Sequence, residues 1–220
     1  MNFFFDVGST IMAGPARSPR AQLHSLLSDH NSELADLGHL VYGTRIESAH
    51  DLVLAISYMD RDVITDQHCM RSISRIWYDQ YQLAHMIDGM SHVLRFIHQS
   101  ARWHVISNIW KPFWDRCRDE FLLCGVSPQT ATLSYMTGWV KPDPKIYLCA
   151  LDQAGCTASD SIMIGDSWEK DIRPALAVGM RAIHIGGPTD GLAADGVHCV
   201  RDAYELLGLL KILVETGEFG

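Results

Sequence analysis

The sequence predicts an α/β protein built on a doubly wound parallel sheet, with an all-helical block inserted near its N-terminus. Over residues 91–220, short apolar runs alternate with helical patterns, as in βα units of a parallel sheet. Asn2–Phe5 is apolar almost throughout rather than alternating, which is typical of a strand covered on both faces. Residues 14–90 instead repeat apolar positions at helical spacing.

The inserted block is predicted from helix starts and apolar spacing. Ser18-Pro19 has the form of a helix start, with Ser as the N-cap and Pro in the first turn, and Ser48 opens a further helix. Apolar residues recur at helical spacing in three sets, which are Leu23, Leu26 and Leu27; Leu34, Leu37 and Val41; and Met70, Ile73, Ile76 and Trp77. We expect three or four helices between Gly14-Pro15 and Asp88-Gly89.

The rest of the chain predicts the sheet. Helices are expected at 91–99, 111–124, 144–154, 171–178 and 202–213, and strands at 103–106, 131–135, 161–164, 182–185 and 198–200. Ligands of such sheets bind beyond the carboxyl ends of the strands, where the strand order reverses. The polar residues placed there are Asp6, Ser107-Asn108 and Gly165-Asp166, with Lys141 in a nearby loop.

Composition limits the classes of partner. The chain has 220 residues, 47% hydrophobic and 20% charged, which is ordinary for a globular protein with one core domain and an insertion. A net charge of −8 argues against nucleic-acid or membrane-surface binding. No apolar stretch is long enough to span a membrane, and Phe3–Phe5 lacks the basic flank of a signal peptide. The six cysteines form no C-x-x-C pair, which favours reduced thiols and a cytoplasmic location.

Each polar segment could have either a chemical role or an ordinary structural role. Asp6 suits a nucleophile or a metal ligand, but also a turn. Ser107-Asn108 can supply a hydroxyl and a backbone N–H to an oxyanion, but is also common turn chemistry. Lys141 lies in a stiff Lys-Pro-Asp-Pro loop, where most lysines are solvated. Asp166 and Asp171, at one strand–loop–helix junction, suit a hard divalent cation or an N-cap with a surface acid.

Three tryptophans could likewise have either a functional role or a packing role. Trp77 lies on a helical apolar stripe and is expected in the core. Trp110 and Trp114 flank the Ser107-Asn108 loop, so they could touch a substrate, but we favour packing.

Taken together, in this order and with βα units between them, the four segments resemble the haloacid dehalogenase-like (HAD) hydrolase superfamily. The resemblance is strongest in KPDPKIY at 141–147 and IGDSWEKD at 164–171, weaker in VISN at 105–108, and incomplete in FDVGST at 5–10. It implies a Rossmann-like core domain at residues 1–13 and 91–220 and a helical cap domain at 14–90.

The resemblance also implies a reaction, most readily Mg²⁺-dependent hydrolysis of a phosphate monoester of a small molecule. Asp6 would attack phosphorus and form an aspartyl-phosphate. Ser107 and Lys141 would neutralise the transferred group, while Thr10 and Asn108 would help to bind it. The implied Mg²⁺ ligands are Asp6, the backbone carbonyl of Gly8, Asp166 and Asp171.

Gly8 departs from the family pattern. Phosphatases of the family carry an aspartate here, which protonates the leaving group and later activates water. Positioned acid–base catalysis contributes about 10²–10⁴-fold. A phosphatase with Gly8 would need a good leaving group or an acid from the cap, for which the candidates are His24, His30, Glu33, Glu47 and His50.

Three other interpretations compete with this one, of which phosphonate cleavage is nearly excluded. Dehalogenases of the superfamily also lack the second aspartate, and Arg17, Arg20 or Arg45 could bind a haloacid carboxylate; the intact Asp166 and Asp171 argue against this reading. Phosphonate cleavage requires a cap lysine, and residues 14–90 contain none. In the last interpretation, the protein is catalytically impaired and keeps the phosphate or metal pocket as a binding or regulatory module.

Overall fold

The centre of the molecule is a six-stranded parallel sheet with the order β5-β4-β1-β6-β7-β8. The computed structural model describes residues 1–28, 37–59, 63, 65–186 and 196–218. The strands of the sheet are β1 (Asn2–Phe5), β4 (Arg102–Ser107), β5 (Ala131–Leu133), β6 (Ser161–Gly165), β7 (Arg181–Ile185) and β8 (Val197–Val200). From β1 the chain builds outward through β4 and β5 on one side and through β6, β7 and β8 on the other. The predicted doubly wound α/β fold is therefore confirmed.

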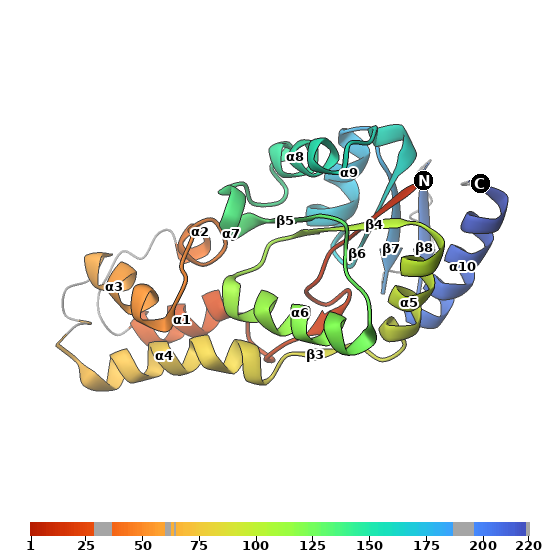
Figure 1. Ribbon diagram of the computed structural model, residues 1–220. Coiled ribbons are helices and arrows are strands. Elements are labelled where there is room, and N and C mark those ends of the chain that lie inside the picture. The colour runs from red at the N-terminus through yellow and green to blue at the C-terminus, as the bar shows by residue number, and fades with distance from the viewer. Residues whose placement is uncertain (29–36, 60–62, 64, 187–195, 219–220) are drawn as a thin grey trace.

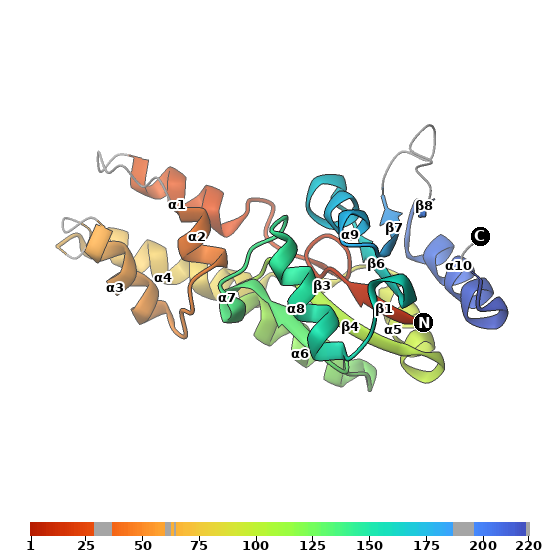
Figure 2. The same cartoon turned by 90° about the horizontal axis from the view of Figure 1, so that it is seen from above.

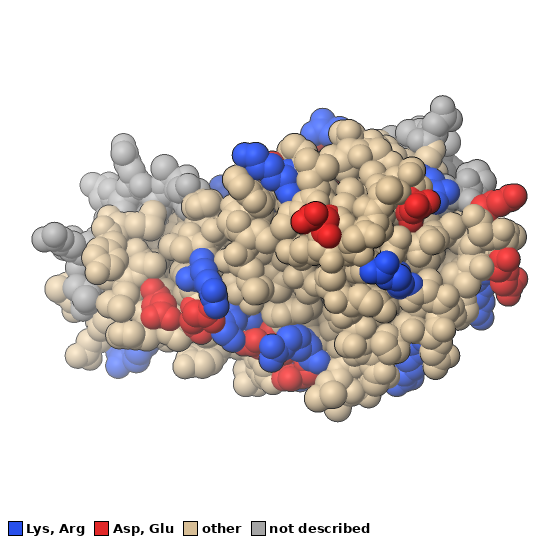
Figure 3. Space-filling model, turned by 45° about the horizontal axis from the view of Figure 1, so that its top comes forward, with Lys and Arg blue, Asp and Glu red and all other residues tan. Residues whose placement is uncertain are grey.

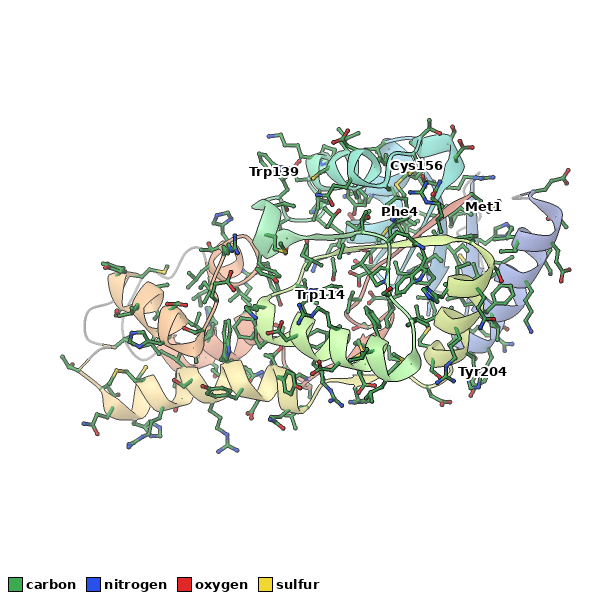
Figure 4. The ribbon with its side chains drawn as sticks, in the orientation of Figure 1. Met1, Phe4, Trp114, Trp139, Cys156 and Tyr204 are labelled. Carbon is green, nitrogen blue, oxygen red and sulfur yellow. The ribbon has the colours of Figure 1, made fainter. Side chains whose placement is uncertain are left out.

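Helices cover both faces of this sheet (Figure 1). One face packs against α5 (Met90–Ser100), α6 (Lys111–Cys124) and α10 (Ala203–Thr216), and the other against α8 (Pro144–Ala154) and α9 (Arg173–Ala177). Because successive side chains of a strand point to opposite faces, Phe3 and Phe5 join the first layer and Phe4 joins the second, towards α8 (Figure 4). Burial on both faces explains why β1 is apolar without alternation.

The helical block leaves and re-enters the rest of the molecule through a short ribbon. β2 (Met12–Ala13) pairs antiparallel with β3 (His85–Met86). In the described part of the chain, the helices between them are α1 (Pro19–Leu27), α2 (Leu37–Tyr42), α3 (Ala49–Met59) and α4 (Gln67–Gln82). They lie together beside the sheet (Figures 1 and 2). The ribbon was not predicted, since two residues are too few to show an alternating pattern, and the division into core and cap domains stays a prediction.

The helices of the block form where the sequence places caps and apolar rows. Ser18 caps α1, its hydroxyl accepting a hydrogen bond from Ala21 N at 3.3 Å. The buried row of α4 holds Cys69, Ile73, Ile76, Trp77 and, as its one polar member, Gln80. Trp77 is a core residue, as predicted, and its ring meets that of Trp110 edge-on with 5.1 Å between centroids. Leu34, expected on a helix, lies outside the described residues.

Two elements begin or end at residues other than those predicted. The strand expected at 131–135 stops at Leu133, and α7 (Ser134–Thr137) follows. The buried Ser134 hydroxyl accepts a hydrogen bond from Ile109 N at 3.1 Å and donates one to the Ile109 carbonyl at 3.2 Å, and these contacts with the loop after β4 hold Ser134 at the start of α7. The helix expected at 171–178 begins earlier, as a π-helical turn η4 (Trp168–Ile172) that continues into α9. Ser167 caps this turn by accepting a hydrogen bond from Lys170 N at 3.3 Å.

The surface carries charges of both signs. On the face in Figure 3, among the residues that the structure describes, Lys and Arg are interspersed with Asp and Glu. No described helix has the length and apolar character needed to cross a membrane.

A buried histidine in β4 makes stability depend on pH. His104 is 0% exposed, its ring stacks on Phe4 with 4.7 Å between centroids, and Nδ1 lies 2.9 Å from Thr130 Oγ1. Burial, with a smaller contribution from Arg102, lowers the pKa of His104 from 6.5 to about 4. Between these values the unfolded chain binds a proton that the folded chain does not, so stability falls as pH falls through this window.

We predict that His104 alone lowers the free energy of unfolding by about 2 kcal/mol between pH 7 and pH 5, at roughly 1.4 kcal/mol per pKa unit. Urea denaturation at the two pH values measures this change. His104→Gln keeps a hydrogen-bonding group beside Thr130 and should lose that part of the pH dependence. Equal pH slopes in the two proteins would contradict the prediction.

Candidate active site

The site lies at the carboxyl ends of three adjacent strands. Asp6 follows β1, Ser107 ends β4, and Asp166 follows β6, and these strands are neighbours in the order β4-β1-β6. Lys141 and Asp171 reach the same place from the loop before α8 and from η4. Parallel strands bring their carboxyl ends to one edge, so residues far apart in the sequence meet there.

The Lys141 ammonium holds the site together. Its Nζ donates hydrogen bonds to Asp6 Oδ1 at 2.6 Å, to Asp171 Oδ1 at 2.5 Å and to the backbone carbonyl of Ile106 at 3.2 Å. A lysine ammonium has three protons, so every donor is used. Lys141, Asp6 and Asp171 are all buried. Burial by itself lowers the pKa of Lys141, but the carboxylates of Asp171 and Asp6 outweigh it and raise the pKa overall.

Asp6 keeps one carboxylate oxygen free. Ser107 Oγ donates to Asp6 Oδ1 at 3.0 Å, the same oxygen that Lys141 contacts. Oδ2 therefore has no hydrogen-bond partner among the described residues. The carboxylate is oriented through one oxygen, and the other can attack an electrophile or bind a cation.

The site carries excess negative charge. Burial, together with the nearby Asp171 and Asp166, raises the pKa of Asp6 from 3.8 to about 6, although Lys141 acts in the opposite direction. Burial and then Asp171 raise the pKa of Asp166 as well. When all three acids are ionised, three negative charges face one buried ammonium. A further cation at this position would relieve the excess.

The acids are close enough to share such a cation. Asp6, Asp166 and Asp171 each offer a carboxylate oxygen, and these oxygens lie within 4.8 Å of one another. Carboxylate oxygens are the donors that Mg²⁺ and Ca²⁺ take in proteins. Both Asp171 oxygens already accept hydrogen bonds, from Lys141 and from Ser167 N at 3.0 Å. Asp6 and Asp166 are therefore the freer of the three, and the donor set fits a hard divalent cation.

Gly165 makes the approach of Asp171 possible. A Cβ at Gly165 would lie 2.5 Å from Asp171 Cβ and 2.6 Å from its Oδ2, far inside normal contact. Glycine at the end of β6 therefore leaves the space that the Asp171 side chain occupies. His184 braces the same segment, with Nε2 lying 2.9 Å from the backbone oxygen of Asp166.

The turn after Asp6 places two further predicted residues. Thr10 is buried, and its hydroxyl lies 3.4 Å from Asp166 Oδ1, at the long end of a hydrogen bond. Gly8 is exposed at the cavity, and a Cβ built on it meets no atom within 4 Å. The position where family phosphatases carry an aspartate is thus open space.

Asn108 has a different use from the one expected. Its amide donates to the Lys141 carbonyl at 2.9 Å and accepts from Lys141 N at 2.7 Å. The side chain thus fixes the lysine loop. Its substrate-binding role stays a prediction.

A cavity of about 440 Å³ opens above these residues, towards α1, α4 and α6. Beyond the acids and Lys141, its lining includes Met12, Tyr42, Gln80, Trp110, Phe113 and Lys170. Sequence reasoning did not identify Tyr42, Gln80 or Lys170, although a polar Gln80 in the apolar row of α4 was an available signal. Trp110 both packs and lines the cavity.

The described cap residues that were considered as acids or carboxylate ligands do not line the cavity. Among the described residues that line the cavity, none is His24, Glu47 or His50. His30 and Glu33 lie outside the described residues. The arginines Arg17, Arg20 and Arg45 are also not part of the described lining.

Comparison with known proteins shows which protein family this chain resembles in sequence. The HAD-hydrolase-like family model matches residues 138–193, which contain the lysine loop and the Asp166–Asp171 segment. A bovine (Bos taurus) haloacid dehalogenase-like hydrolase domain-containing protein 3 is 42% identical over 55 residues, or 25% of this chain and 22% of that protein. Over this segment the chain is similar to the haloacid dehalogenase-like hydrolase superfamily, and it spans less than a quarter of the length of the bovine relative.

Solved structures of the superfamily share the fold over nearly the whole chain. A haloacid dehalogenase-like family hydrolase from Xanthomonas campestris has a TM-score of 0.62 at 20% identity, covering 97% of this chain and 96% of that one. A 2-haloacid dehalogenase from Pseudomonas syringae has 0.60 at 18%, covering 96% and 98%. A family enzyme from Bacteroides thetaiotaomicron, in complex with magnesium and inorganic phosphate, has 0.61 at 14%, covering 88% and 98%.

From the cluster of Asp6, Asp166 and Asp171 we expect that Mg²⁺ stabilises the folded protein. A ligand that binds only the folded state at 100 times its Kd adds about 2.7 kcal/mol, which raises the unfolding temperature by several degrees. We expect Mg²⁺ to raise the unfolding temperature of the natural protein, and to raise that of Asp166→Asn much less, as measured by calorimetry. The control is Asp152→Asn, an exposed acid on α8, which should respond like the natural protein. An equal Mg²⁺ response in all three would exclude the cluster as the binding site.

Proposed function

We propose that this HAD-superfamily hydrolase is a Mg²⁺-dependent phosphate monoester hydrolase that uses Asp6 as its nucleophile. The supporting observation is the free Asp6 Oδ2 beside a buried ammonium and two further carboxylates. Phosphoryl transfer depends mainly on a positioned nucleophile and on charges that neutralise the transferred group. Asp6 supplies the first requirement and Lys141 contributes to the second.

The proposed reaction has two steps. Asp6 Oδ2 attacks phosphorus, the bond from phosphorus to the ester oxygen breaks, and the alkoxide leaves with the electron pair and takes a proton from water. Water then attacks phosphorus of the aspartyl-phosphate, the bond from phosphorus to Asp6 Oδ2 breaks with its electron pair returning to the carboxylate, and the proton lost by the attacking water passes to solvent as inorganic phosphate is released. Lys141 and Ser107 hold Asp6 in orientation through its Oδ1, and the positive charge of Lys141 would offset negative charge on the transferred phosphoryl group. Held by Asp6, the Gly8 carbonyl, Asp166 and Asp171, Mg²⁺ would neutralise negative charge on the phosphoryl group.

The open position at Gly8 sets the expected substrate preference. Among the described residues that line the cavity, no histidine or glutamate is placed to protonate the leaving oxygen. Asp6, Asp166 and Asp171 are assigned to attack and to metal binding. Esters whose alcohols leave readily as anions should therefore be the best substrates, because they need little help from an acid.

Dehalogenation is the second candidate, because Gly8 also fits the first motif of dehalogenases. Two observations weigh against it. Asp166 and Asp171 keep the metal-binding pattern, and no arginine lines the described part of the cavity to hold a haloacid carboxylate. Halide release that persists in a chelator would favour this candidate over the phosphatase. Retained Mg²⁺ or phosphate binding without turnover of any ester or haloacid would favour a binding or regulatory module.

Replacing the nucleophile tests the proposal directly. We predict that Asp6→Asn abolishes Mg²⁺-dependent release of phosphate from p-nitrophenyl phosphate, since an amide does not form the aspartyl-phosphate. Phosphate release is followed with and without chelator, with Asp152→Asn as the control that retains activity. Full activity of Asp6→Asn would remove Asp6 from the mechanism.

Restoring the missing acid gives a second test. Gly8→Asp fits the open space, and we expect it to raise turnover of a poor-leaving-group ester such as glycerol 3-phosphate by about 10²-fold, the lower end of positioned acid–base catalysis. Turnover of p-nitrophenyl phosphate should change far less. Gly8→Asn, of the same shape without the acid, is the matched control. The same gain in Gly8→Asn, or no gain in Gly8→Asp, would show that a missing acid does not limit the reaction.

A further inference from the structure

Lys170 is a cation of the cavity lining whose ammonium pairs with no acid among the described residues. Its backbone is fixed in η4, because the N–H donates to Ser167 Oγ at 3.3 Å and the carbonyl accepts from the Tyr147 hydroxyl. The neighbouring acid Glu169 pairs with Arg173 instead. The Lys170 side chain is exposed, so its flexible stem can carry the ammonium to a ligand in the cavity.

A second cation lies near the cavity on the side of α1. Arg20 is exposed and has no acid partner in the described part of the chain. It does not line the cavity but lies near Tyr42, which does; burial raises the pKa of Tyr42, and Arg20 acts in the opposite direction. Lys141, by contrast, is already bound to Asp6 and Asp171. The charges available from η4 and α1 thus favour a ligand that is negative beyond its transferred phosphoryl group.

The open position at Gly8 limits the group that can leave. A Cβ there meets no atom within 4 Å, and the described lining holds no acid besides Asp6, Asp166 and Asp171. An alkoxide is the anion of a group whose pKa is close to that of water, about 15.7. A carboxylate or a phosphate is the anion of an acid with a pKa of about 4 or about 6, and it leaves without a proton. The missing acid and the unpaired cations therefore favour the same kind of substrate.

We propose that the protein hydrolyses anhydrides of phosphoric acid, in which the group that leaves phosphorus is itself a carboxylate or a phosphate, and that Lys170 binds this leaving group. Acyl phosphates and diphosphates share this chemistry. A positive charge placed where negative charge develops stabilises the transition state. The inference rests on the proposed function, because it uses the same attack of Asp6 on phosphorus, and it adds a class of substrate with better leaving groups.

The departure of the leaving group needs no acid. Asp6 Oδ2 attacks phosphorus, the bond from phosphorus to the bridging oxygen breaks, and the carboxylate or phosphate departs with the electron pair. The Lys170 ammonium keeps its protons and offsets the negative charge that the bridging oxygen gains. Water then releases phosphate from Asp6 as in the hydrolysis of an ester.

Substrates that differ in the leaving group test the substrate class. The natural protein would be assayed with Mg²⁺ on acetyl phosphate, pyrophosphate and glycerol 3-phosphate, after subtraction of the rate without protein. We expect kcat/KM for at least one anhydride to exceed that for glycerol 3-phosphate by about 10²-fold or more, and the preferred anhydride distinguishes an acyl phosphate from a diphosphate. Gly8→Asp should raise turnover of the ester but not of the anhydrides. Equal kcat/KM values for the ester and both anhydrides would overturn the inference.

Variants of Lys170 test the role of its charge. Lys170→Gln removes the charge, Lys170→Arg keeps it, and Lys211→Gln is the control, because Lys211 is exposed on α10 and does not line the cavity. We expect Lys170→Gln to lower kcat/KM for the preferred anhydride about fivefold at low salt, as for one partly exposed ion pair. Lys170→Arg and the control should retain most of the activity. The loss should shrink at high salt, because salt screens exposed charges, whereas a structural defect would persist.

The ester p-nitrophenyl phosphate separates the leaving group from the transferred group. Its departing charge spreads over the nitrophenyl ring, so Lys170→Gln should lower its turnover much less than that of the anhydride. An equal loss for both substrates would show that Lys170 serves the transferred phosphoryl group or the fold, and no loss for either would show that it serves neither. Both results would overturn the leaving-group role.

The inference and the proposed function can fail separately. If esters are hydrolysed but anhydrides are not preferred, the inference alone is wrong. If an anhydride is hydrolysed with the expected dependence on Lys170 while no ester is, the ester assignment is wrong and the inference is supported. If neither class is hydrolysed, both are wrong.

Discussion

The buried ammonium of Lys141 is the interaction on which the site depends. It joins Asp6 at the end of β1 to Asp171 in η4, and it does so where water is largely excluded. Removing one partner of a buried ion pair leaves an uncompensated charge and costs several kcal/mol. The surrounding structure serves to place this one group. Asn108 clamps the backbone of the lysine loop from both sides, and Gly165 leaves room for the Asp171 side chain.

The same arrangement lowers the stability of the folded protein and leaves polar groups available for a reaction. Two more carboxylates than ammonium groups meet in this site, and burial, followed by the repulsion between the acids, raises the pKa values of Asp6 and Asp166. Gln80 Nε2 and Trp110 Nε1 add two buried donors that have no hydrogen-bond partner in the part of the chain that the structure describes. One continuous hydrophobic cluster runs from α1–α4 into the sheet layer of α5, α6 and α10. The apolar packing thus supports two sets of polar groups that are not satisfied internally.

Much of the fold and part of the site could be predicted because their signals are local. β1 is recognisable from four consecutive residues, and Lys141 and Asp166 stand in the short motifs KPDPKIY and IGDSWEKD that carry the family resemblance. The predictions were wrong where a distant contact decided the outcome, as at the end of β5, where Ser134 turns to Ile109. They were silent on β2 and β3, whose pairing needs two segments more than 70 residues apart.

The sequence by itself determined the parallel α/β architecture and which acids and lysine stand at strand ends, because apolar period and strand-end chemistry are read within a few residues. Only the tertiary structure decided that Asn108 supports the lysine loop, that the space at Gly8 is empty, and that Gln80 and Trp110 both line the cavity. These facts depend on how α4 packs against α6 and on how loops from separate βα units meet. Such contacts are set by the packing of the whole chain, and no short stretch of sequence encodes them.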